Sequence, residues 1–179
     1  ELKGGSPSGD GGSIKCSQCE LDIDNVKFTD NTASIKGGAI YVSDSTSKML
    51  LRNTLFSGNQ GTAGGAIAVI DANNVTISDS DFNNNIAATG DGGAIESAKD
   101  MTIKGSGFLS NRAASGDGGA VKMFGAKLTA SGSSFKNNKA KRGGALKTTG
   151  DLDFSNMVIL PVRGPEYCSV LVNDHTITI

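Results

Sequence analysis

Gly64-Gly65-Ala66-Ile67, followed by Phe82-Asn83-Asn84-Asn85, is the stretch of sequence that decides the fold. A second copy follows, because Gly92-Gly93-Ala94-Ile95 begins 28 residues after the first tetrad and precedes its own Phe-x-x-Asn motif. Five such pairs occur, and a sixth tetrad has no partner motif. The glycine pairs are Gly11-Gly12, Gly37-Gly38, Gly64-Gly65, Gly92-Gly93, Gly118-Gly119 and Gly143-Gly144, and the partner motifs are Phe28/Asn31, Phe56/Asn59, Phe82/Asn85, Phe108/Asn111 and Phe135/Asn138. So tight a period indicates one structural unit that is copied and stacked, a solenoid.

The repeating unit has no helical period. Short alternating runs such as Leu21-Asp22-Ile23 and Val75-Thr76-Ile77 stand between tetrad and phenylalanine, and this pattern predicts a half-buried strand. A second strand is predicted at the tetrad, as in Ala39-Ile40-Tyr41-Val42, and a third after Phe-x-x-Asn, as in Ile86-Ala87-Ala88. Three strands and three corners in about 27 residues predict an all-β parallel β-helix of about six rungs.

Equivalent residues of successive rungs should form columns. We expect the five phenylalanines to stack inside as an aromatic ladder. We expect the five asparagines, Asn31 to Asn138, to turn a corner, with each side-chain amide bonded to the asparagines above and below, because Asn tolerates tight turns and bonds locally. The Gly-Gly pairs suit a corner that needs positive φ and a close approach of backbones. We therefore interpret these motifs as residues that maintain the fold, not as ligand-binding residues.

The residue before each glycine pair forms a further column, which reads Asp10, Lys36, Ala63, Asp91, Asp117 and Arg142. Opposite charges adjoin at Asp10 with Lys36 and at Asp117 with Arg142, where cross-rung pairs are predicted. Asp91 beside Asp117 is the exception, and two carboxylates are too few for a calcium site. The sequence predicts no metal, no cofactor and no catalytic set.

Composition excludes several classes of protein. The chain has 179 residues, 25 glycines, no tryptophan and a net charge of -1, and the absence of a basic stripe argues against nucleic acid. The longest apolar run, Met157 to Val162, is too short to span a membrane. Without an initiator Met or a signal peptide, we expect a mature chain or an excised piece. Residues 120–150 carry seven bases and no acid, which predicts either a solvated surface or a head-to-tail attraction to the acidic first rung.

Three cysteines are the disulfide candidates, namely Cys16, Cys19 and Cys168. An odd number in a secreted chain leaves one thiol free or bonded to another molecule, so a link from Cys168 to Cys16 or Cys19 of the next subunit is one hypothesis. A zinc site of these three with His175 would require the chain ends to meet. Asn74-Val75-Thr76 is the one N-glycosylation sequon and makes Asn74 a candidate glycosylation site.

The alternation of Gly-Gly-Ala-Ile/Leu/Val with Phe-x-x-Asn resembles the repeats of chlamydial polymorphic outer membrane proteins and of secreted algal and protist relatives. The resemblance covers about residues 9–146. It implies a right-handed parallel β-helix, exposed as the passenger of an autotransporter, that binds host cells and self-associates. The missing C-terminal membrane barrel departs from the family pattern and weakens any assignment to an outer membrane.

The repeat decays after Leu146, and Pro161 and Pro165 interrupt it. We therefore divide the chain into β-helix repeats, 1–160, and a C-terminal segment, 161–179. Cys168 to Val172 and His175 to Ile179, joined by a turn at Asn173-Asp174, predict a β-hairpin. This hairpin either caps its own chain or pairs with a neighbour in a head-to-tail fibre.

Three functions are compatible with this sequence. The first is a non-catalytic extracellular or cell-surface structural or adhesive protein, whose partners are copies of itself and host-cell or surface glycans and proteins. The second is a carbohydrate-active enzyme, which needs convergent carboxylates. The candidate carboxylates are Asp79, Asp81, Asp91, Glu96, Asp100 and Asp117, and they are scattered through turns. The third is an ice-binding face, which needs a Thr-x-Thr array found only at Thr176-Ile177-Thr178.

Overall fold

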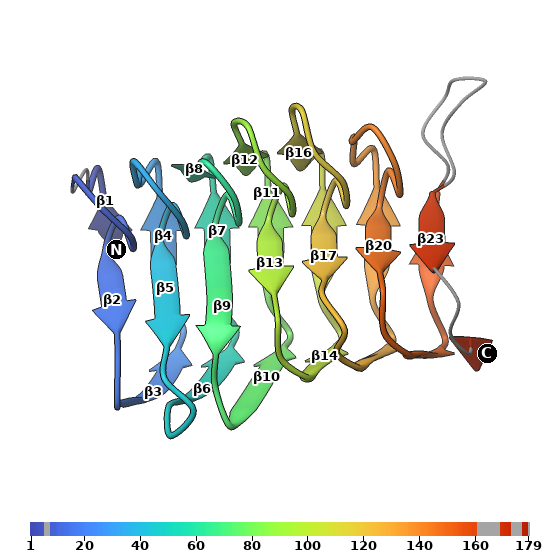
Figure 1. Cartoon of the computed structure of the whole chain (residues 1–179), viewed down its shortest axis with the longest axis horizontal. Coiled ribbons are helices and arrows are strands. Elements are labelled where there is room, and N and C mark those ends of the chain that lie inside the picture. Colours follow the sequence, from blue (N-terminus) through green and yellow to red (C-terminus); the bar gives the residue numbers. More distant parts are fainter. Residues whose placement is uncertain (6–7, 161–168, 173–176, 179) are drawn as a thin grey trace.

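The computed structural model describes residues 1–5, 8–160, 169–172 and 177–178. The described chain is a stack of flat rungs, with the two termini at opposite ends of the stack (Figure 1). All paired strands run parallel, and no helix occurs among the described residues. Three sheets of seven strands and one sheet of three strands run along the stack. The predicted parallel β-helix of about six rungs is confirmed.

The phenylalanine sheet carries the Phe-x-x-Asn motifs. It consists of β1 (Leu2–Lys3), β4 (Lys27–Thr29), β7 (Leu55–Ser57), β11 (Asp81–Asn83), β15 (Gly107–Leu109), β19 (Ser134–Lys136) and β22 (Val158–Ile159). Phe82 is in register with Phe56 on one side and Phe108 on the other. The sequence reading placed strands before and after the phenylalanine but none at it, because a three-residue strand flanked by polar residues shows little alternation.

The alternating sheet contains the runs predicted as half-buried strands. It consists of β3 (Glu20–Asp24), β6 (Lys48–Arg52), β10 (Asn74–Ser78), β14 (Met101–Lys104), β18 (Leu128–Ser131), β21 (Leu152–Ser155) and β24 (Ile177–Thr178). Its inward residues, such as Val75 and Ile77, are buried, while Asn74, Thr76 and Ser78 point outward. The period-2 pattern predicted this sheet correctly.

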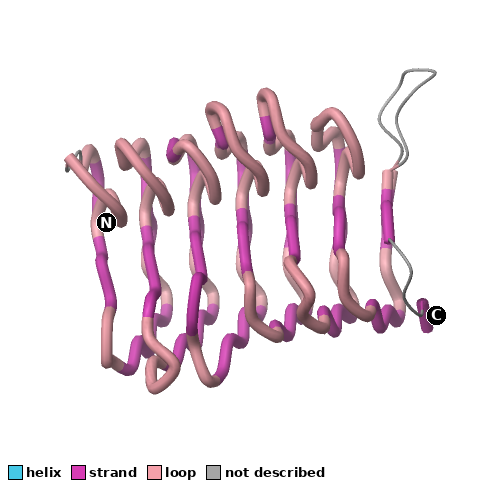
Figure 2. The backbone as a smooth tube through the Cα atoms, in the orientation of Figure 1, coloured by secondary structure: helices cyan, strands magenta, loops and turns pink. Residues whose placement is uncertain are grey.

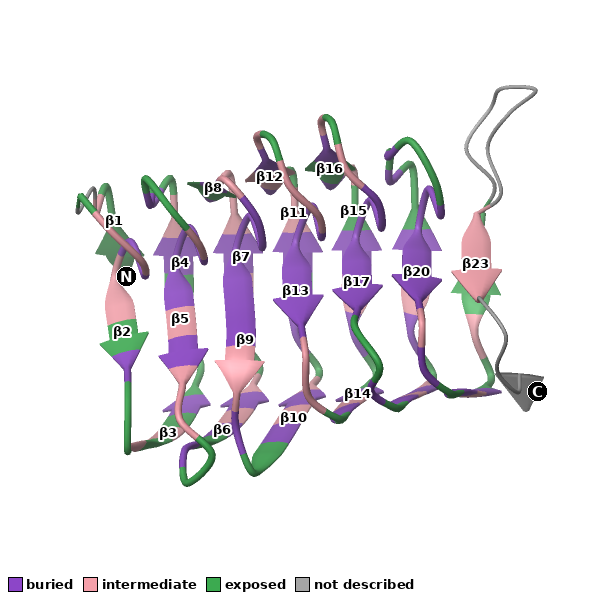
Figure 3. Ribbon diagram, viewed as in Figure 1, coloured by how far each residue is buried: buried purple, intermediate pink, exposed green. Residues whose placement is uncertain are grey.

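The tetrad sheet begins at the aliphatic residue of each Gly-Gly tetrad. It consists of β2 (Ile14–Cys16), β5 (Ile40–Ser43), β9 (Ile67–Asp71), β13 (Ile95–Ser97), β17 (Val121–Met123), β20 (Leu146–Thr148) and β23 (Val170–Val172). Three of these strands are buried on both faces, namely β13, β17 and β20. The outer face of these strands is therefore covered. The segments between each asparagine and the next glycine pair, which we call the corner loops, lie over it (Figure 3).

The short strand predicted after Phe-x-x-Asn forms only the three-stranded corner sheet. It consists of β8 (Gln60–Gly61), β12 (Ile86–Ala87) and β16 (Arg112–Ala113). Single bridges at Thr32 and Lys139 extend it by one rung at each end. The loops that follow these strands project from one edge of the stack (Figure 2).

The predicted C-terminal hairpin is wrong. β23 pairs in parallel with β20, and β24 pairs in parallel with β21, so the two strands lie in different sheets and continue the stack by part of a seventh rung. Alternating hydrophobic runs are the same for a hairpin and for two corners of a rung, and only the pairing partner distinguishes them. Residues 161–168 and 173–176, with Cys168 and His175, lie outside the described residues, and the domain division at 160 stays a prediction.

Candidate functional site

The five phenylalanines form one column in the core. Consecutive ring centroids lie 4.8 Å apart, or 4.6 Å for Phe108 and Phe135, and neighbouring ring planes are within 3° of parallel. The rings are at most 1% exposed. Their spacing equals the ordinary distance between paired strands, so the backbone hydrogen bonds set it and the rings follow.

The five asparagines form a buried amide column beside the rings. Asn85 Nδ2 donates to Asn111 Oδ1 at 2.9 Å and to the Phe56 carbonyl oxygen at 3.0 Å, and the Asn85 backbone N–H also donates to Asn111 Oδ1. Asn59 and Asn111 repeat this pattern in the rungs on either side. Because these amides are used inside the column, the three central asparagines have no free group for a ligand.

The two end members of the asparagine column, Asn31 and Asn138, depart from the prediction that each amide bonds an asparagine above and below. Asn31 Nδ2 donates to Asn59 Oδ1 at 2.9 Å, but Asn31 Oδ1 accepts from the Gly5 backbone N–H at 3.0 Å and from Ser13 Oγ at 2.7 Å.

Asn138 is the mirror case. Its Oδ1 accepts from the Asn111 amide at 3.0 Å, while its Nδ2 donates to the Phe108 carbonyl oxygen at 3.0 Å. The reason for both departures is position, because the repeat supplies no asparagine before Asn31 and no Phe-x-x-Asn motif after Asn138. Both end residues are nevertheless at most 1% exposed, so the prediction that they maintain the fold agrees with their burial.

A hydroxyl column, which the sequence reading missed, runs two residues before the phenylalanines. Its members are Thr54, Ser80, Ser106 and Ser133. The backbone N–H of each of the first three donates to the hydroxyl of the next rung, and all four hydroxyls donate to the carbonyl two residues before them. The signal was present, since the repeated motif is [Ser/Thr]-x-Phe-x-x-Asn in four rungs.

The two glycines of each tetrad are required for different reasons. Gly64 has φ +58°, a conformation that strains any residue with a Cβ. A Cβ on Gly65 would instead lie 2.6 Å from Ile86 N and collide with the Gly93 carbonyl oxygen of the next rung. Positive φ thus belongs to the first glycine, where a Cβ would also collide with the Ile67 carbonyl of its own rung, and the close approach between rungs belongs to the second.

Cys16 and Cys19 form a disulfide across the corner between β2 and β3, with Cα atoms 5.8 Å apart. Both sulfurs of this pair are used within the chain, which contradicts the hypothesis that Cys168 of another subunit links to one of them. The same bond removes two of the four ligands of the hypothetical zinc site. Cys168 and His175 lie outside the described residues.

The predicted pair between Asp10 and Lys36 is wrong as an ion pair. Asp10 accepts a hydrogen bond from the Lys36 backbone N–H at 3.2 Å and pairs with Lys15 Nζ at 3.3 Å. Lys36 Nζ lies instead 2.5 Å from Glu96 Oε1, two rungs further along the stack. A lysine side chain is long enough to pass over a rung that has alanine at the equivalent positions, which a nearest-neighbour reading does not consider.

The predicted pair between Asp117 and Arg142 is confirmed, and Lys147 joins it. Asp117 accepts from Arg142 Nε at 3.0 Å and Nη2 at 2.9 Å, and from Lys147 Nζ at 3.0 Å. Burial opposes ionisation of Asp117, but the hydrogen bonds and charges of Arg142 and Lys147 outweigh it and lower its pKa. Asp91 Oδ1 accepts from the Asp117 backbone N–H at 2.7 Å. No group of three metal-ligating side chains occurs in the described part of the chain.

Lys122 is a buried cation next to this pair. Its side chain is covered, its Nζ lies 4.2 Å from the centre of the Phe124 ring, and it donates to the Met123 carbonyl oxygen at 3.3 Å. Burial lowers the pKa of Lys122, and the nearby charge of Asp91 opposes that shift. Glu96, Asp117, Lys122 and Lys147 thus form a buried charged layer between the tetrad sheet and the corner loops.

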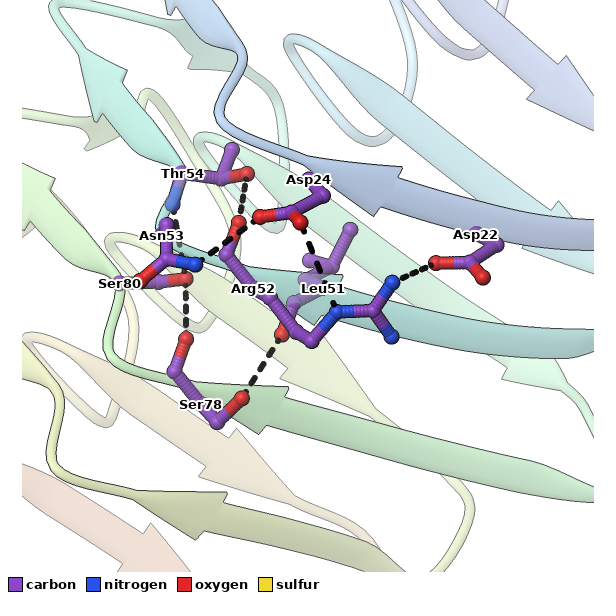
Figure 4. Close-up of polar contacts among 8 residues, drawn as sticks. All are labelled: Asp22, Asp24, Leu51, Arg52, Asn53, Thr54, Ser78 and Ser80. Carbon is purple, nitrogen blue, oxygen red and sulfur yellow. Dashed lines mark hydrogen bonds and ion pairs between the residues drawn. The ribbon is translucent and has the colours of Figure 1, made fainter.

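The outer face of the alternating sheet carries cross-rung ion pairs at its N-terminal end. Arg52 Nη2 lies 2.6 Å from Asp22 Oδ1, its Nε lies 3.9 Å from Asp24, and Asn53 Nδ2 donates to Asp24 at 2.9 Å (Figure 4). The same view shows the hydroxyl column, where Thr54 donates to the Arg52 carbonyl oxygen. Exposed pairs of this kind contribute little stability singly and mainly neutralise neighbouring rungs.

Two shallow grooves lie on the same face, with volumes of about 210 Å³ and 120 Å³. Both include Asn74, whose exposed side chain accepts a hydrogen bond from Thr76. The sequon is therefore accessible, and a glycan at Asn74 would occupy the point where the grooves meet. No aromatic residue lines either groove, so neither has the ring that sugar stacking uses.

The structure does not bring the candidate carboxylates of an enzyme together. Asp91, Glu96 and Asp117 come from the tetrad corner, but Glu96 and Asp117 are bound by lysine and arginine. Asp100 accepts from the Lys127 backbone N–H at the opposite corner. Asp79 and Asp81 flank the hydroxyl column near the phenylalanine sheet. These carboxylates are engaged by the fold or lie in different columns.

A threonine column lies on the alternating sheet, where the sequence reading found no array. Thr76, Thr102 and Thr129 are in register in three neighbouring rungs. Leu50 and Asp153 continue the column on either side, so the array ends after three rungs. Aligning the alternating runs on their phenylalanines would have revealed it.

No helix among the described residues is long and apolar enough to cross a membrane.

Comparison with known families agrees with this geometry. A family model described as a right handed beta helix region matches residues 8–159, which is most of the chain. The protein belongs to this family of right-handed parallel β-helices, and the predicted handedness of the fold is confirmed. Searches among curated proteins and among solved structures returned no match.

Proposed function

We propose that this chain is a non-catalytic, extracellular structural or adhesive protein that assembles head-to-tail into a surface filament. The observation that carries the proposal is that the side chains of each rung are bonded to or packed against those of the neighbouring rungs. Phenylalanine, asparagine and hydroxyl columns bind one rung to the next, and Asp22, Glu96 and Asp117 pair with cations of other rungs. A rod built in this way serves as a scaffold along its whole length.

Two further observations support this function. The Cys16–Cys19 disulfide favours an oxidising compartment, such as the cell exterior. Within the described chain, β2 and β3 at the N-terminal end of the stack each have a paired strand on one side only, and such edges can pair with another chain. A heterologous contact between this edge and the last rung of another copy would extend the sheets into a fibre.

The repeat motifs favour one more specific version of this proposal. The alternation of Gly-Gly-Ala-aliphatic with Phe-x-x-Asn is similar to the repeats of chlamydial polymorphic outer membrane proteins. In that version, the chain is an adhesin passenger, and its corner loops contact a host-cell or surface partner. The corner loops support this version because they project from one edge of the rod and differ in sequence between rungs (Figure 2).

Negative-stain electron microscopy of the purified chain tests the proposal. Long thin fibres that lengthen with protein concentration are the expected result, and short rods at all concentrations would contradict head-to-tail assembly. Reductant should leave the fibres intact, because Cys16 and Cys19 are bonded to each other and not between copies. Fibres that dissolve on reduction would show that intermolecular disulfides, not sheet edges, hold them together.

A further inference from the structure

Exposed cations are concentrated on two rungs near the C-terminal end, from the last residue of β19 through the corner that follows it. We call this cluster the basic corner, and its members are Arg112, Lys136, Lys139, Lys141 and Arg142. Four of them fall within the seven residues Lys136–Arg142, a density typical of polyanion-binding segments. Arg112 joins them from the preceding rung.

The stacking of like charges distinguishes this corner from the N-terminal end of the rod. Arg112 and Lys139 are direct partners in a parallel bridge, so their backbones lie one strand spacing apart. At the N-terminal end of the alternating sheet, outward cations have acids beside them, as Arg52 has Asp22 and Lys48 has Glu20. Like charges placed opposite each other destabilise paired strands, so the fold alone does not favour the arrangement at the basic corner.

Within the described chain, four of the five members of the basic corner form no ion pair with a carboxylate. Arg142 is the one member with an ion pair, to Asp117, and that carboxylate is already shared with Lys147. Arg112, Lys136, Lys139 and Lys141 are exposed and form no ion pair with a described residue. In the equivalent column, the three preceding rungs carry the neutral residues Thr32, Gln60 and Ile86. The positive charge is therefore local to two rungs, while the whole chain has a net charge of -1.

We propose that the basic corner is a binding site for an anionic polysaccharide, a sugar chain with repeated sulfate or carboxylate groups. Cations from successive rungs repeat at the strand spacing along the rod and can each meet an anion of an extended chain. The choice of a polysaccharide over other polyanions rests on the proposed extracellular adhesive function. It agrees with the sequence around the corner, since neither 109–116 nor 136–142 contains an aromatic residue for stacking nucleic acid bases. Leu109 is in register with Lys136, and Leu160 lies beside it on the following rung; both are exposed, and two leucines are too few to insert into a membrane.

Binding of a heparin hexasaccharide and of polygalacturonate, measured by titration calorimetry, tests the site and separates sulfate from carboxylate recognition. The patch variant carries Arg112→Gln, Lys136→Gln, Lys139→Gln and Lys141→Gln. The control variant carries Lys3→Gln, Lys15→Gln, Lys27→Gln and Lys104→Gln, which removes the same charge from exposed positions elsewhere. Circular dichroism and the melting temperature establish that both variants are folded.

We expect the wild type to bind at least one of these chains, with an affinity that falls as salt rises. The patch variant should bind at least about tenfold more weakly, while the control variant should bind like the wild type. Equal weakening in both variants would reduce the effect to net charge and overturn the site. Absence of binding to both chains, or binding only to phosphatidylserine vesicles or to DNA, would overturn the polysaccharide assignment.

Fibre formation by the same variants separates this proposal from the proposed function. Fibres from the patch variant with lost polysaccharide binding would support the site and leave assembly intact. If the patch variant fails to form fibres and the wild type binds neither sugar chain, the occupant is the acidic first rung of another copy, and the polysaccharide site is wrong. If the wild type binds a polysaccharide and the patch variant does not, but neither protein forms fibres, the proposal of head-to-tail assembly is wrong and the polysaccharide site is supported.

Discussion

Lys36 is bound to Glu96, 60 residues further along the chain and two rungs away, with Nζ 2.5 Å from Oε1. The intervening rung has alanine at both equivalent positions, Ala63 and Ala68, which leaves room for the lysine side chain to cross. Glu96 is 6% exposed and Lys36 is 35% exposed. The pair therefore ties together three rungs of the rod instead of two.

A double-mutant cycle on Lys36→Met and Glu96→Gln should give a coupling free energy of about 1–3 kcal/mol, because Glu96 is buried and has no other cation partner among the described residues. Urea unfolding followed by circular dichroism measures it. The matched cycle on Lys48 and Glu20, an exposed pair, should give less than about 1 kcal/mol. Equal coupling in both cycles would mean that the crossing over Ala68 does not persist in solution.

Phe82→Ala should lower the free energy of unfolding by about 3–5 kcal/mol, since it removes one fully buried ring from the middle of the column. Chemical denaturation measures the loss. Phe124→Ala is the control, because Phe124 is 40% exposed and should cost about 1 kcal/mol or less. An unchanged unfolding midpoint for Phe82→Ala would be incompatible with a stacked core.

Asn85→Ala should destabilise the fold by roughly 2 kcal/mol or more. It removes the acceptor of two donors, the Asn59 amide and the Asn59 backbone N–H, and leaves both buried and unpaired. Asn83→Ala is the control, because Asn83 ends the strand just before Asn85 but is half-exposed. Thermal unfolding distinguishes the two, and equal melting temperatures would place the asparagine column in solvent.

Stability should depend on pH through Asp117. Its pKa is lowered below the ordinary value of 3.8 in the folded chain, so its contribution is fully present above that value and is lost as pH falls through the lowered value. Wild type should therefore exceed Asp117→Asn in stability above about pH 4, and the difference should shrink in more acidic solution. Unfolding at a series of pH values measures the gap. Asp81→Asn, which changes the charge equally without breaking an ion pair, is the control, and an Asp117 gap that stays constant with pH would contradict the assignment.

Gly65→Ala should destabilise the rod by about 3 kcal/mol or more, because the new methyl would meet backbone atoms of Ile86 and Gly93 that cannot move aside. Gly9→Ala is the matched control, since a Cβ there has no atom within 4 Å. Differential scanning calorimetry compares the two variants. If both tolerate alanine equally, the second tetrad glycine is not a contact between rungs.

The repeat period carried most of what could be predicted. Because every rung has the same path, residues 25 to 28 positions apart must stack, and the phenylalanine and asparagine columns follow from the spacing alone. In these two columns the period failed only at the ends, since Asn31 and Asn138 each lack one asparagine neighbour, and Asn31 bonds instead to Gly5 and Ser13.

The hydroxyl column at Thr54 and Ser80 obeys the same logic and was available to the same alignment. Local pattern failed at the C-terminus, where Val170–Val172 and Ile177–Thr178 have the alternation of a hairpin but pair with earlier rungs. The residues of a strand show which of its faces is apolar. Which other strand it pairs with depends on the rest of the stack.

Sequence alone determined that parallel rungs stack and which residues are in register. It also determined the separate roles of the phenylalanine rings, the asparagine amides and the glycines, because a repeat places equivalent residues in the same local environment. Tertiary structure decided which charges meet. Asp10 is adjacent to Lys36 in the column, yet Lys36 reaches Glu96, and Asp117 gathers both Arg142 and Lys147. Long side chains choose partners by the space and burial around them, and the corner loops over the tetrad sheet create that environment only once the rungs are stacked.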